Sequence, residues 1–360
     1  MEIEIFERMH QFDELASTWD AIHAKDENAH LFVSWRWLRM CFELSSDLWC
    51  VLAAKRSKDQ EYVGFFPLTI KQITCCNIGR AYHICMGVKP FSEYTGFFCH
   101  PEYQATVLAF FADFLKRELH WEYCHLADVV DPRLDGFLDS FTNSEYTLIE
   151  RSSLDCPRIR LASTWEEYLR NSLNRRSRRA LRQTMRKLES IEGFHVSTAS
   201  ADNLAFHIET LLKMWQARHG KTSMDVVHHR RLLKAAFFSG NLWLKLAWSN
   251  NTPVVGLAIF EDPVDKVYYT FLTAYNPEFA KISPGLAMFG YAIREAITKG
   301  YKYFDLLRGA PEYKISRLGG ESRSATSVVL RHRYAKFRSI LNRLQNRSLF
   351  KHDLKRSATR

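Results

Sequence analysis

Residues 266–314 constrain the fold of this chain more than any other stretch. Residues 267–275, VYYTFLTAY, are β-branched or aromatic at nearly every position, the composition of a strand buried on both faces. Residues 285–299 then place apolar side chains at three- and four-residue spacings, which predicts one buried face of a helix. Gly300 ends that helix, and residues 301–307 alternate like a second strand. The stretch therefore predicts a strand, a loop, a helix and a strand, in that order.

The loop between this strand and helix is the expected ligand site. A crossover of this length joins parallel neighbours and places the loop beyond the carboxyl end of the first strand, where open α/β sheets hold ligands. Ser283 can cap the helix, Pro284 suits its first position, and Gly285 lets a ligand approach backbone N–H groups. Free N–H groups and the helix dipole would bind an anion, most naturally a phosphate. The alternative is an ordinary capped start of a helix.

Composition narrows the class of protein. A length of 360 residues predicts two domains, and a 46% hydrophobic fraction indicates packed structure rather than disorder. No apolar run approaches the roughly 20 residues needed to cross a bilayer. Because the first residues are acidic and unlike a secretory signal, we expect a soluble, cytoplasmic protein. The eight cysteines lie within the first 156 residues without a CxxC pair, so we expect reduced thiols and no metal site.

The positive charge is concentrated at the C-terminal end of the sequence. The formal net charge is +10, and residues 331–360 hold ten lysines and arginines but a single acid, Asp353. The rest of the chain is nearly neutral, which argues against a domain coated for nucleic acid. Apolar residues at helical spacing predict that this tail is a basic amphipathic helix. We expect it to pack on the body, and the alternatives are an anionic membrane surface or a partner.

An internal repeat indicates how the chain is organised. Residues 49–68 and 243–260 both begin with Trp, both contain a Val-Gly pair, and both are interpreted as hairpins. Farther on, the segment from Pro101 to Tyr123 corresponds to the segment from Pro277 to Tyr303, and each encloses a predicted helix. The repeat predicts one α/β fold used twice.

Domain boundaries follow from this repeat. We expect an N-terminal domain over 1–154, a C-terminal domain over 155–330, and the tail over 331–360. The second copy is longer by four residues where KISPG lies, so we expect the phosphate site in the second copy only. The first copy would then be a scaffold and a wall for the acceptor.

Residues 163–190 are predicted to form one long helix that opens with a capping box, Ser163 with Glu166. One face of this helix is apolar and the other is basic. A basic helix face is ordinarily just solvated. The alternatives are contact with donor phosphates or with an anionic acceptor, for which arginine forks are well suited. The basic side chains are Arg170, Arg175, Arg176, Arg178, Arg179, Arg182, Arg186 and Lys187.

Residues 155–330, and more weakly the whole chain, resemble the GNAT acyltransferase superfamily in its CelD/BcsL-like acetyltransferase branch. FemAB-type transferases, which carry two GNAT folds, are near relatives of that branch. The order and spacing of several segments carry the resemblance. These segments are SWRWLRMCFE at 34–43, LNRRSRRALRQTMRKLE at 173–189, VVGLAIF at 254–260, AYNPEFAKISPGLAM at 274–288 and FDLLRGAPEYK at 304–314. The resemblance implies an α/β (α+β) protein with a tandem GNAT-like fold, that is, two mixed sheets flanked by helices.

The resemblance also implies a donor site. In this superfamily acyl-CoA, often acetyl-CoA, lies between the strands that flank the helix, with its pyrophosphate at the loop. The usual loop pattern is a basic residue or Gln, two residues, Gly, one residue, and Gly or Ala. Gly285 and Ala287 fit, whereas Ile282 occupies the basic position with Lys281 beside it. The expected donor-binding residues are Lys281, Ser283, Gly285, Leu286 and Ala287, with the backbone N–H groups of Leu272, Thr273 and Ala274 polarising the carbonyl.

Direct transfer without an acyl-enzyme is also implied by the resemblance. The absence of a G-x-S-x-G motif and of a Ser-His-Asp or Cys-His signature agrees with it. Tyr313 is the expected acid, with Tyr275 as the alternative. Asp305 could act as the base or orient the acceptor amine, or could be a satisfied carboxylate at the end of a strand.

The acceptor side is predicted from scattered residues. Arg308 and Lys314 are candidates for a phosphate or an acceptor carboxylate, and helix capping or surface pairing is their alternative role. Glu93 and Tyr94 could face a cleft between the domains, and Trp35 could wall an acceptor pocket, although aromatic residues at helical spacing are mostly core. The resemblance adds Arg218, on a helix expected over 204–218.

These observations predict an acyltransferase that moves an acyl group from acyl-CoA or a related carrier to an amine or hydroxyl. The acceptor could be a small molecule, a peptide or a polysaccharide. Two alternatives remain open. The first is a FemAB-like transferase that uses aminoacyl-tRNA, which the basic helix over 163–190 would suit. The second is a non-catalytic module whose tail binds an anionic surface, either a membrane or nucleic acid.

Overall fold

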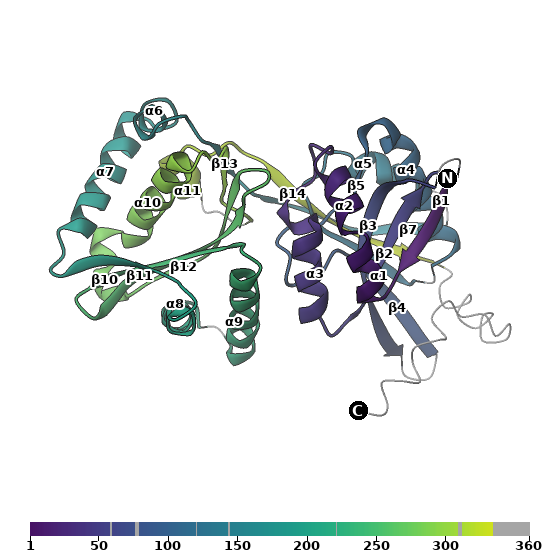
Figure 1. Cartoon of the computed structure of the whole chain (residues 1–360), viewed down its shortest axis with the longest axis horizontal. Helices are drawn as coiled ribbons and strands as arrows, with labels where there is room; N and C mark the ends of the chain where they lie inside the picture. Colours follow the sequence, from purple (N-terminus) through teal and green to yellow (C-terminus); the bar gives the residue numbers. More distant parts are fainter. Residues whose placement is uncertain are drawn as a thin grey trace. The chain divides into compact units, whose positions relative to one another are not determined.

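The computed structural model describes residues 1–57, 60–75, 79–119, 121–142, 145–220, 222–308 and 312–333. The chain forms two compact units (Figure 1). Unit 1 contains Met1–Ser153 and the residues from Ala325 onward, and unit 2 contains Leu154–Ser324. Each unit has its own mixed sheet, so the expected fold of two mixed sheets flanked by helices is confirmed.

Unit 1 is built on a sheet with strands in the order β1-β2-β3-β4-β6-β14-β7, and β5 pairs with β3. Its core contains apolar side chains of β2, β3 and β4 packed against α4 and α5. The strands are β1 Glu2–Phe6, β2 Leu48–Lys55, β3 Tyr62–Cys75, β4 Gly79–Met86, β5 Phe98–Cys99, β6 Tyr123–Val129, β7 Tyr146–Asp155 and β14 Ser324–His332. The helices are α1 Met9–Glu14, α2 Ala16–His23, η1 Leu31–Val33, α3 Trp35–Leu44, η2 Pro101–Tyr103, α4 Gln104–Arg117 and α5 Leu134–Asp139.

Unit 2 has a sheet in the order β8-β13-β12-β11-β10-β9, covered on both faces. Helices α6, α7, α10 and α11 cover one face, and α8 and α9 cover the other (Figure 1). The strands are β8 Arg158–Arg160, β9 Phe194–Thr198, β10 Leu242–Ser249, β11 Thr252–Asp262, β12 Val267–Tyr275 and β13 Tyr303–Asp305. The helices are α6 Trp165–Asn171, α7 Arg175–Glu189, α8 Leu204–His219, α9 Ser223–Phe238, η3 Pro277–Ile282, α10 Pro284–Thr298 and α11 Glu312–Leu318.

Strand β14 lies within the range expected for the second domain but belongs to unit 1. β14 pairs antiparallel with β6, from Thr326↔Val129 to Arg331↔Tyr123. Val328 and Leu330 are buried in the core of unit 1. Alternation of apolar residues indicates that a strand forms, but it carries no information about which sheet the strand joins. The expected domain end at residue 330 is therefore replaced by a unit boundary at Ser324.

The single helix predicted over 163–190 is two helices in the structure. Thr164, rather than Ser163, caps α6 by accepting the N–H of Glu167 at 3.2 Å. Asn174 caps α7 by accepting the N–H of Ser177 at 2.8 Å. Because an Asn side chain that takes a backbone N–H favours a helix start over a helix interior, the chain bends between the two helices.

The internal repeat is visible in the strand pairing. β4 pairs in parallel with β6 at His83↔Tyr123, and β12 pairs in parallel with β13 at Val267↔Tyr303. The two Val-Gly pairs, however, are not equivalent. A Cβ on Gly64 would meet Val107 of α4, whereas a Cβ on Gly256 would meet Leu211 of α8, which covers the face opposite α10. The two glycines therefore face opposite sides of their sheets relative to α4 and α10.

The described part of the chain contains neither a candidate transmembrane helix nor a candidate metal cluster. None of its helices is long and apolar enough to cross a membrane. Within the same residues, no group of three or more His, Cys, Asp or Glu side chains is arranged to hold a metal ion. Residues 334–360, which contain most of the predicted basic tail, lie outside the described residues.

Candidate active site

Strands β12 and β13 pair over the first part of β12 and then separate. They pair at Val267↔Tyr303, Tyr268↔Phe304 and Tyr269↔Asp305. Beyond these pairs β12 continues to Tyr275, while β13 turns toward β8, where the Leu306 N–H donates to Pro157 O at 2.9 Å. The second half of β12 therefore has an edge to which no described strand pairs.

A β-bulge lies where the strands separate. Ala258 of β11 pairs with Leu272, but the next residue, Ile259, pairs with Thr270, so Phe271 is an extra residue on β12. A bulge bends its strand and increases its twist, and it commonly occurs beside functional sites. The bulge at Phe271 therefore helps to direct the end of β12 away from β13.

The ladder to β11 decides which N–H groups of β12 point to the open edge. The Asn276 N–H donates to Val254 O at 2.9 Å, toward β11. Because N–H groups alternate in direction along an antiparallel strand, those of Ala274 and Leu272 also point to β11. The N–H groups of Thr273 and Tyr275 point to the open edge. Of the three predicted carbonyl-polarising groups, only Thr273 is thus available, and Tyr275 joins it.

Helix α10 starts differently from the prediction. Ser283 has left-handed backbone angles, φ 53° and ψ 54°, and its side chain forms no capping hydrogen bond. Its carbonyl instead accepts the N–H groups of Leu286 at 3.0 Å and Ala287 at 3.3 Å. The N–H of Gly285 has no hydrogen-bond partner among the described residues. The predicted cap at Ser283 is therefore wrong, whereas the predicted free N–H group is present at Gly285.

Space is also available at Gly285. A Cβ built there would meet only Tyr275 Cδ1, at 3.9 Å, which is ordinary van der Waals contact. Packing within unit 2 therefore does not require glycine at this position. Ser283 and Lys281 are exposed nearby, whereas the side chains of Leu286 and Ala287 are buried in the core. The last two residues can offer a ligand only their backbone.

Arg218 and Tyr275 lie together at the end of β12. The Arg218 guanidinium carbon, on α8, is 4.1 Å from the centroid of the Tyr275 ring, the geometry of a cation–π contact. Arg218 is exposed and forms no ion pair with any described carboxylate. The sequence predicted these two residues separately, and the fold brings them side by side.

Asp305 has structural partners. It is fully buried, its Oδ1 accepts the Leu307 N–H at 2.8 Å, and its Oδ2 is 3.3 Å from Arg323 Nη1. Burial, reinforced by the charges of Asp262 and Asp305, raises the pKa of neighbouring Tyr269 well above its ordinary value. These contacts correspond to the alternative in which Asp305 is a satisfied carboxylate at the end of a strand.

Replacing Asp305 with Asn should lower the stability of the protein more than its activity. The Asn oxygen can still accept the Leu307 N–H, but the pairing with Arg323 is lost. We expect the free energy of unfolding to fall by about 1–3 kcal/mol, the range for weakening a buried hydrogen bond to a charged group. Urea unfolding and the expected transfer of acetyl groups from acetyl-CoA would be measured together. A variant of unchanged stability that has lost transfer would instead make Asp305 a participant in the reaction.

The remaining predicted site residues belong to α11, to the segment just after β13 and to unit 1. Tyr313 and Lys314 belong to α11, but their side chains lie outside the described residues, and Arg308 is half-buried just after β13. In unit 1, Tyr94 is fully buried, with its ring 5.9 Å from that of His30. It is therefore a core residue and does not line a cleft.

The other two acceptor candidates of unit 1 also have local partners. The indole N–H of Trp35 donates to Phe12 O at 3.0 Å, which ties this ring to the packing of α1 and α3. The backbone carbonyl of Glu93 accepts a hydrogen bond from Lys89 Nζ at 2.8 Å. Trp35 therefore matches the alternative in which such aromatic residues are core.

In unit 1, the chain itself lies beside β6 beyond the point where β4 and β6 stop pairing. Between β4 and β5, the chain returns to β6, where Thr95 forms a parallel bridge with Val129 and its N–H donates to Asp128 O at 3.3 Å. The Thr95 hydroxyl donates to Ala127 O, and Lys89 Nζ is 2.7 Å from an Asp128 carboxylate oxygen. Because the chain itself occupies this edge, the described residues of unit 1 have no open edge here like that of β12.

Sequence reasoning missed His229, which the structure places beside β12. Its ring centroid is 4.4 Å from that of Trp215 and 5.4 Å from that of Phe271, the bulge residue. Helix α9 begins at Ser223, because Thr222 and Asp225 form a capping box there. That Thr-x-x-Asp pattern was the sequence signal that could have placed His229 inside a helix.

Residues 175–315 match the family model of the acetyltransferase (GNAT) domain. This range includes the open edge of β12, the Gly285 loop and α10. This part of unit 2 is therefore similar to a GNAT acetyltransferase domain. No curated protein matches the sequence.

Solved structures extend the likeness to the whole chain. The crystal structure of FemX aligns at a TM-score of 0.63 and 14% identity, covering 96% of this chain and 100% of FemX. The structure of L-PGS from Bacillus licheniformis aligns at 0.54 and 11%, covering 92% and 97% of the two chains. A tandem GNAT protein from the clavulanic acid biosynthesis pathway aligns at 0.51 and 10%, covering 91% and 98%. At such identities the likeness shows the fold, which is a tandem GNAT-like fold.

Proposed function

We propose that this protein transfers an acyl group from acyl-CoA to an amine or hydroxyl acceptor, because residues 175–315 match the family model of the acetyltransferase (GNAT) domain. Acetyl-CoA is the simplest donor of this class. One observation carries the proposal: β12 separates from β13 just before α10, and the free N–H of Gly285 lies at the start of that helix. The acceptor would be a small molecule, a peptide or a polysaccharide.

The residues present fit such a donor. The Gly285 N–H and the positive end of the α10 dipole would hold a phosphate, and the empty space beside Gly285 allows the phosphate to approach. Exposed Lys281 lies one residue from the position where the family pattern has a basic residue. The donor supplies a thioester carbonyl, whose oxygen the Thr273 and Tyr275 N–H groups at the open edge would stabilise as it gains charge.

Direct attack by the acceptor is supported by the state of the thiols. The described cysteines other than Cys156 lie in unit 1, and most are buried. In unit 2, the Cys156 Sγ donates to Arg323 O at 3.2 Å. Burial raises the pKa of Cys99 to about 12, so this thiol stays protonated and a poor nucleophile at neutral pH. No described thiol therefore has the surroundings of an acyl-carrying nucleophile.

A second candidate is a FemAB-like transferase that takes its acyl group from aminoacyl-tRNA. The basic face of α7 favours this reading. Arg175, Arg176, Arg179 and Arg186 are exposed, and none forms an ion pair within the described part of the chain. Arg182 is the exception, because it pairs with Glu166 at 2.5 Å. Unpaired arginines along one helix suit a phosphate backbone.

Donor binding distinguishes the two candidates. We expect acetyl-CoA to raise the melting temperature, because a ligand at 100 times its Kd stabilises a protein by about 2.7 kcal/mol. Thermal scans with acyl-CoAs of increasing chain length would make the measurement. Acetyl-pantetheine, which lacks the pyrophosphate, is the matched control and should stabilise the protein much less. Salt-sensitive stabilisation by tRNA with none by any acyl-CoA would favour the second candidate.

A further inference from the structure

The imidazole of His229 is oriented by its own helix. Its Nδ1 is 2.7 Å from the carbonyl oxygen of Asp225, one turn earlier in α9. A carbonyl oxygen can only accept, so Nδ1 carries the hydrogen and donates it. The other ring nitrogen, Nε2, then has a free lone pair in the neutral imidazole. Nε2 has no hydrogen-bond partner among the described residues, and the side chain is only partly buried.

His229 lies beside the half of β12 that has the open edge. Its ring stacks on Phe271 with planes 23° apart, and Phe271 is the bulge residue where β12 has already separated from β13. Its other neighbour, Trp215, is one turn of α8 before Arg218, whose guanidinium lies over Tyr275. Helices α8 and α9 therefore place an imidazole and a guanidinium along the same half of β12, on the face opposite α10.

We propose that His229 is the general base of the acyl transfer, an inference that rests on the proposed function. As the acceptor amine attacks the thioester carbonyl carbon, the C–N bond forms and Nε2 of His229 takes the N–H proton. The C–S bond then breaks, and the thiolate that leaves takes a proton from water. Asp225 acts through its backbone carbonyl, which holds the hydrogen on Nδ1 and keeps Nε2 free to accept.

Most charged groups of α8, α9 and β12 near His229 interact with other residues. On α9, the Asp225 carboxylate accepts from Thr222, and Arg230 pairs with Glu209 of α8. His228, the next residue on α9, has an interaction of its own, and on β12 burial keeps the Tyr269 hydroxyl protonated by raising its pKa. Arg218 of α8 also lies near this half of β12 and has no carboxylate partner among the described residues.

Two substitutions separate a base from a packing residue. His229→Phe keeps an aromatic ring between Trp215 and Phe271, and His229→Gln keeps a polar side chain, but neither can accept the proton. His195→Gln is the matched control, because His195 is an exposed histidine of the same unit stacked on Trp248. Acetyl transfer from acetyl-CoA to a panel of primary amines would be followed against pH, with acetyl-CoA affinity measured by calorimetry.

We expect both His229 variants to bind acetyl-CoA like the wild type while kcat falls about 100-fold or more, the usual contribution of a general base. The pH dependence of the wild-type rate should differ from that of the variants, because only the wild type has an imidazole at this position. His195→Gln should behave like the wild type. In the nuclear magnetic resonance spectrum, the His229 ring signal, identified by its absence in His229→Gln, should shift when CoA is added.

Three results would overturn the inference. Normal turnover in His229→Phe would show that the ring only packs. A His229 signal unmoved at saturating CoA would place the ring outside the site. If the wild type neither binds acetyl-CoA nor transfers its acetyl group, the proposed function itself fails and this inference fails with it. Normal acetyl-CoA binding together with unaffected variants would overturn the role of His229 alone.

Discussion

Replacing Gly285 with Asp is expected to abolish binding of the acyl donor while the protein remains folded. The new carboxylate would occupy the place proposed for the donor phosphate, at the start of α10. Like charges brought together cost several kcal/mol, so we expect the Kd for acetyl-CoA to rise about 100-fold or more. The fold should tolerate the change, because a Cβ there meets only Tyr275, at 3.9 Å. Calorimetric titration with acetyl-CoA would measure the effect.

Stability provides the check on this variant. An acid in the first turn of a helix is favourable by about 0.3–1 kcal/mol, so the melting temperature should stay the same or rise slightly. Gly136→Asp is a matched control, since Gly136 lies near the start of α5 and a Cβ there would meet nothing within 4 Å. That variant should bind acetyl-CoA normally. Unchanged donor affinity in Gly285→Asp would remove the phosphate site from the start of α10.

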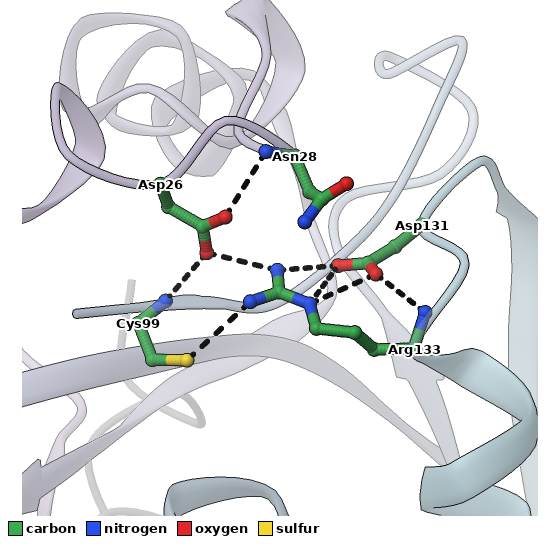
Figure 2. Close-up of polar contacts among 5 residues, drawn as sticks. All are labelled: Asp26, Asn28, Cys99, Asp131 and Arg133. Atoms are coloured by element: carbon green, nitrogen blue, oxygen red, sulfur yellow. Dashed lines mark hydrogen bonds and ion pairs between the residues drawn. The ribbon is translucent and has the colours of Figure 1, made fainter. Parts of the chain in front are cut away.

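Replacing Arg133 with Ala is expected to cause the largest loss of stability. Figure 2 shows its guanidinium between the carboxylates of Asp26 and Asp131, with Nη2 at 2.8 Å and 2.6 Å from them. The three side chains are 12%, 2% and 3% exposed, respectively. Burial alone would lower the pKa of Arg133, but hydrogen bonds and charges from Asp131 and Asp26 hold it above its ordinary value. Removing the guanidinium leaves two buried carboxylates without a cation.

We expect this variant to lose about 3–5 kcal/mol of unfolding free energy, the usual cost of removing one partner from a buried ion pair. Urea unfolding of the full chain, followed by circular dichroism, would measure it. Arg151→Ala is the control in the same unit, because Arg151 also pairs with an aspartate at 2.6 Å but is 46% exposed. That change should cost at most about 1 kcal/mol.

A combined variant tests the cause of the loss. Combining Arg133→Met with Asp26→Asn and Asp131→Asn removes the buried charges. The amide oxygens can still accept the backbone N–H groups of residues 99 and 133. In the wild type these groups donate to carboxylate oxygens of Asp26 at 2.9 Å and Asp131 at 2.8 Å. We expect it to recover most of the stability, because uncompensated charge is the main cost. Equal instability in the single and combined variants would show that lost packing, rather than charge, is responsible.

Local periodicity predicted the centre of unit 2 closely. The buried apolar run at 267–275 is β12, and the helical spacing at 285–299 differs by one residue at each end from α10. The free N–H at Gly285 was also predictable, because proline at the first helical position and glycine at the second leave that group without an internal partner. The same reasoning failed at Ser283, since a left-handed backbone angle depends on how η3 joins α10.

The sequence by itself determined the order of strands and helices, the repetition of one fold and the loop where a donor phosphate could bind, because these follow from residue spacings of two, three or four. Only the tertiary structure decided that β14 joins unit 1, that Thr273 and Tyr275 point to the open edge, and that His229 lies beside Phe271. Each of these depends on contacts between residues far apart in the chain. Such contacts are set by which buried surfaces pack together, and local patterns do not record that choice.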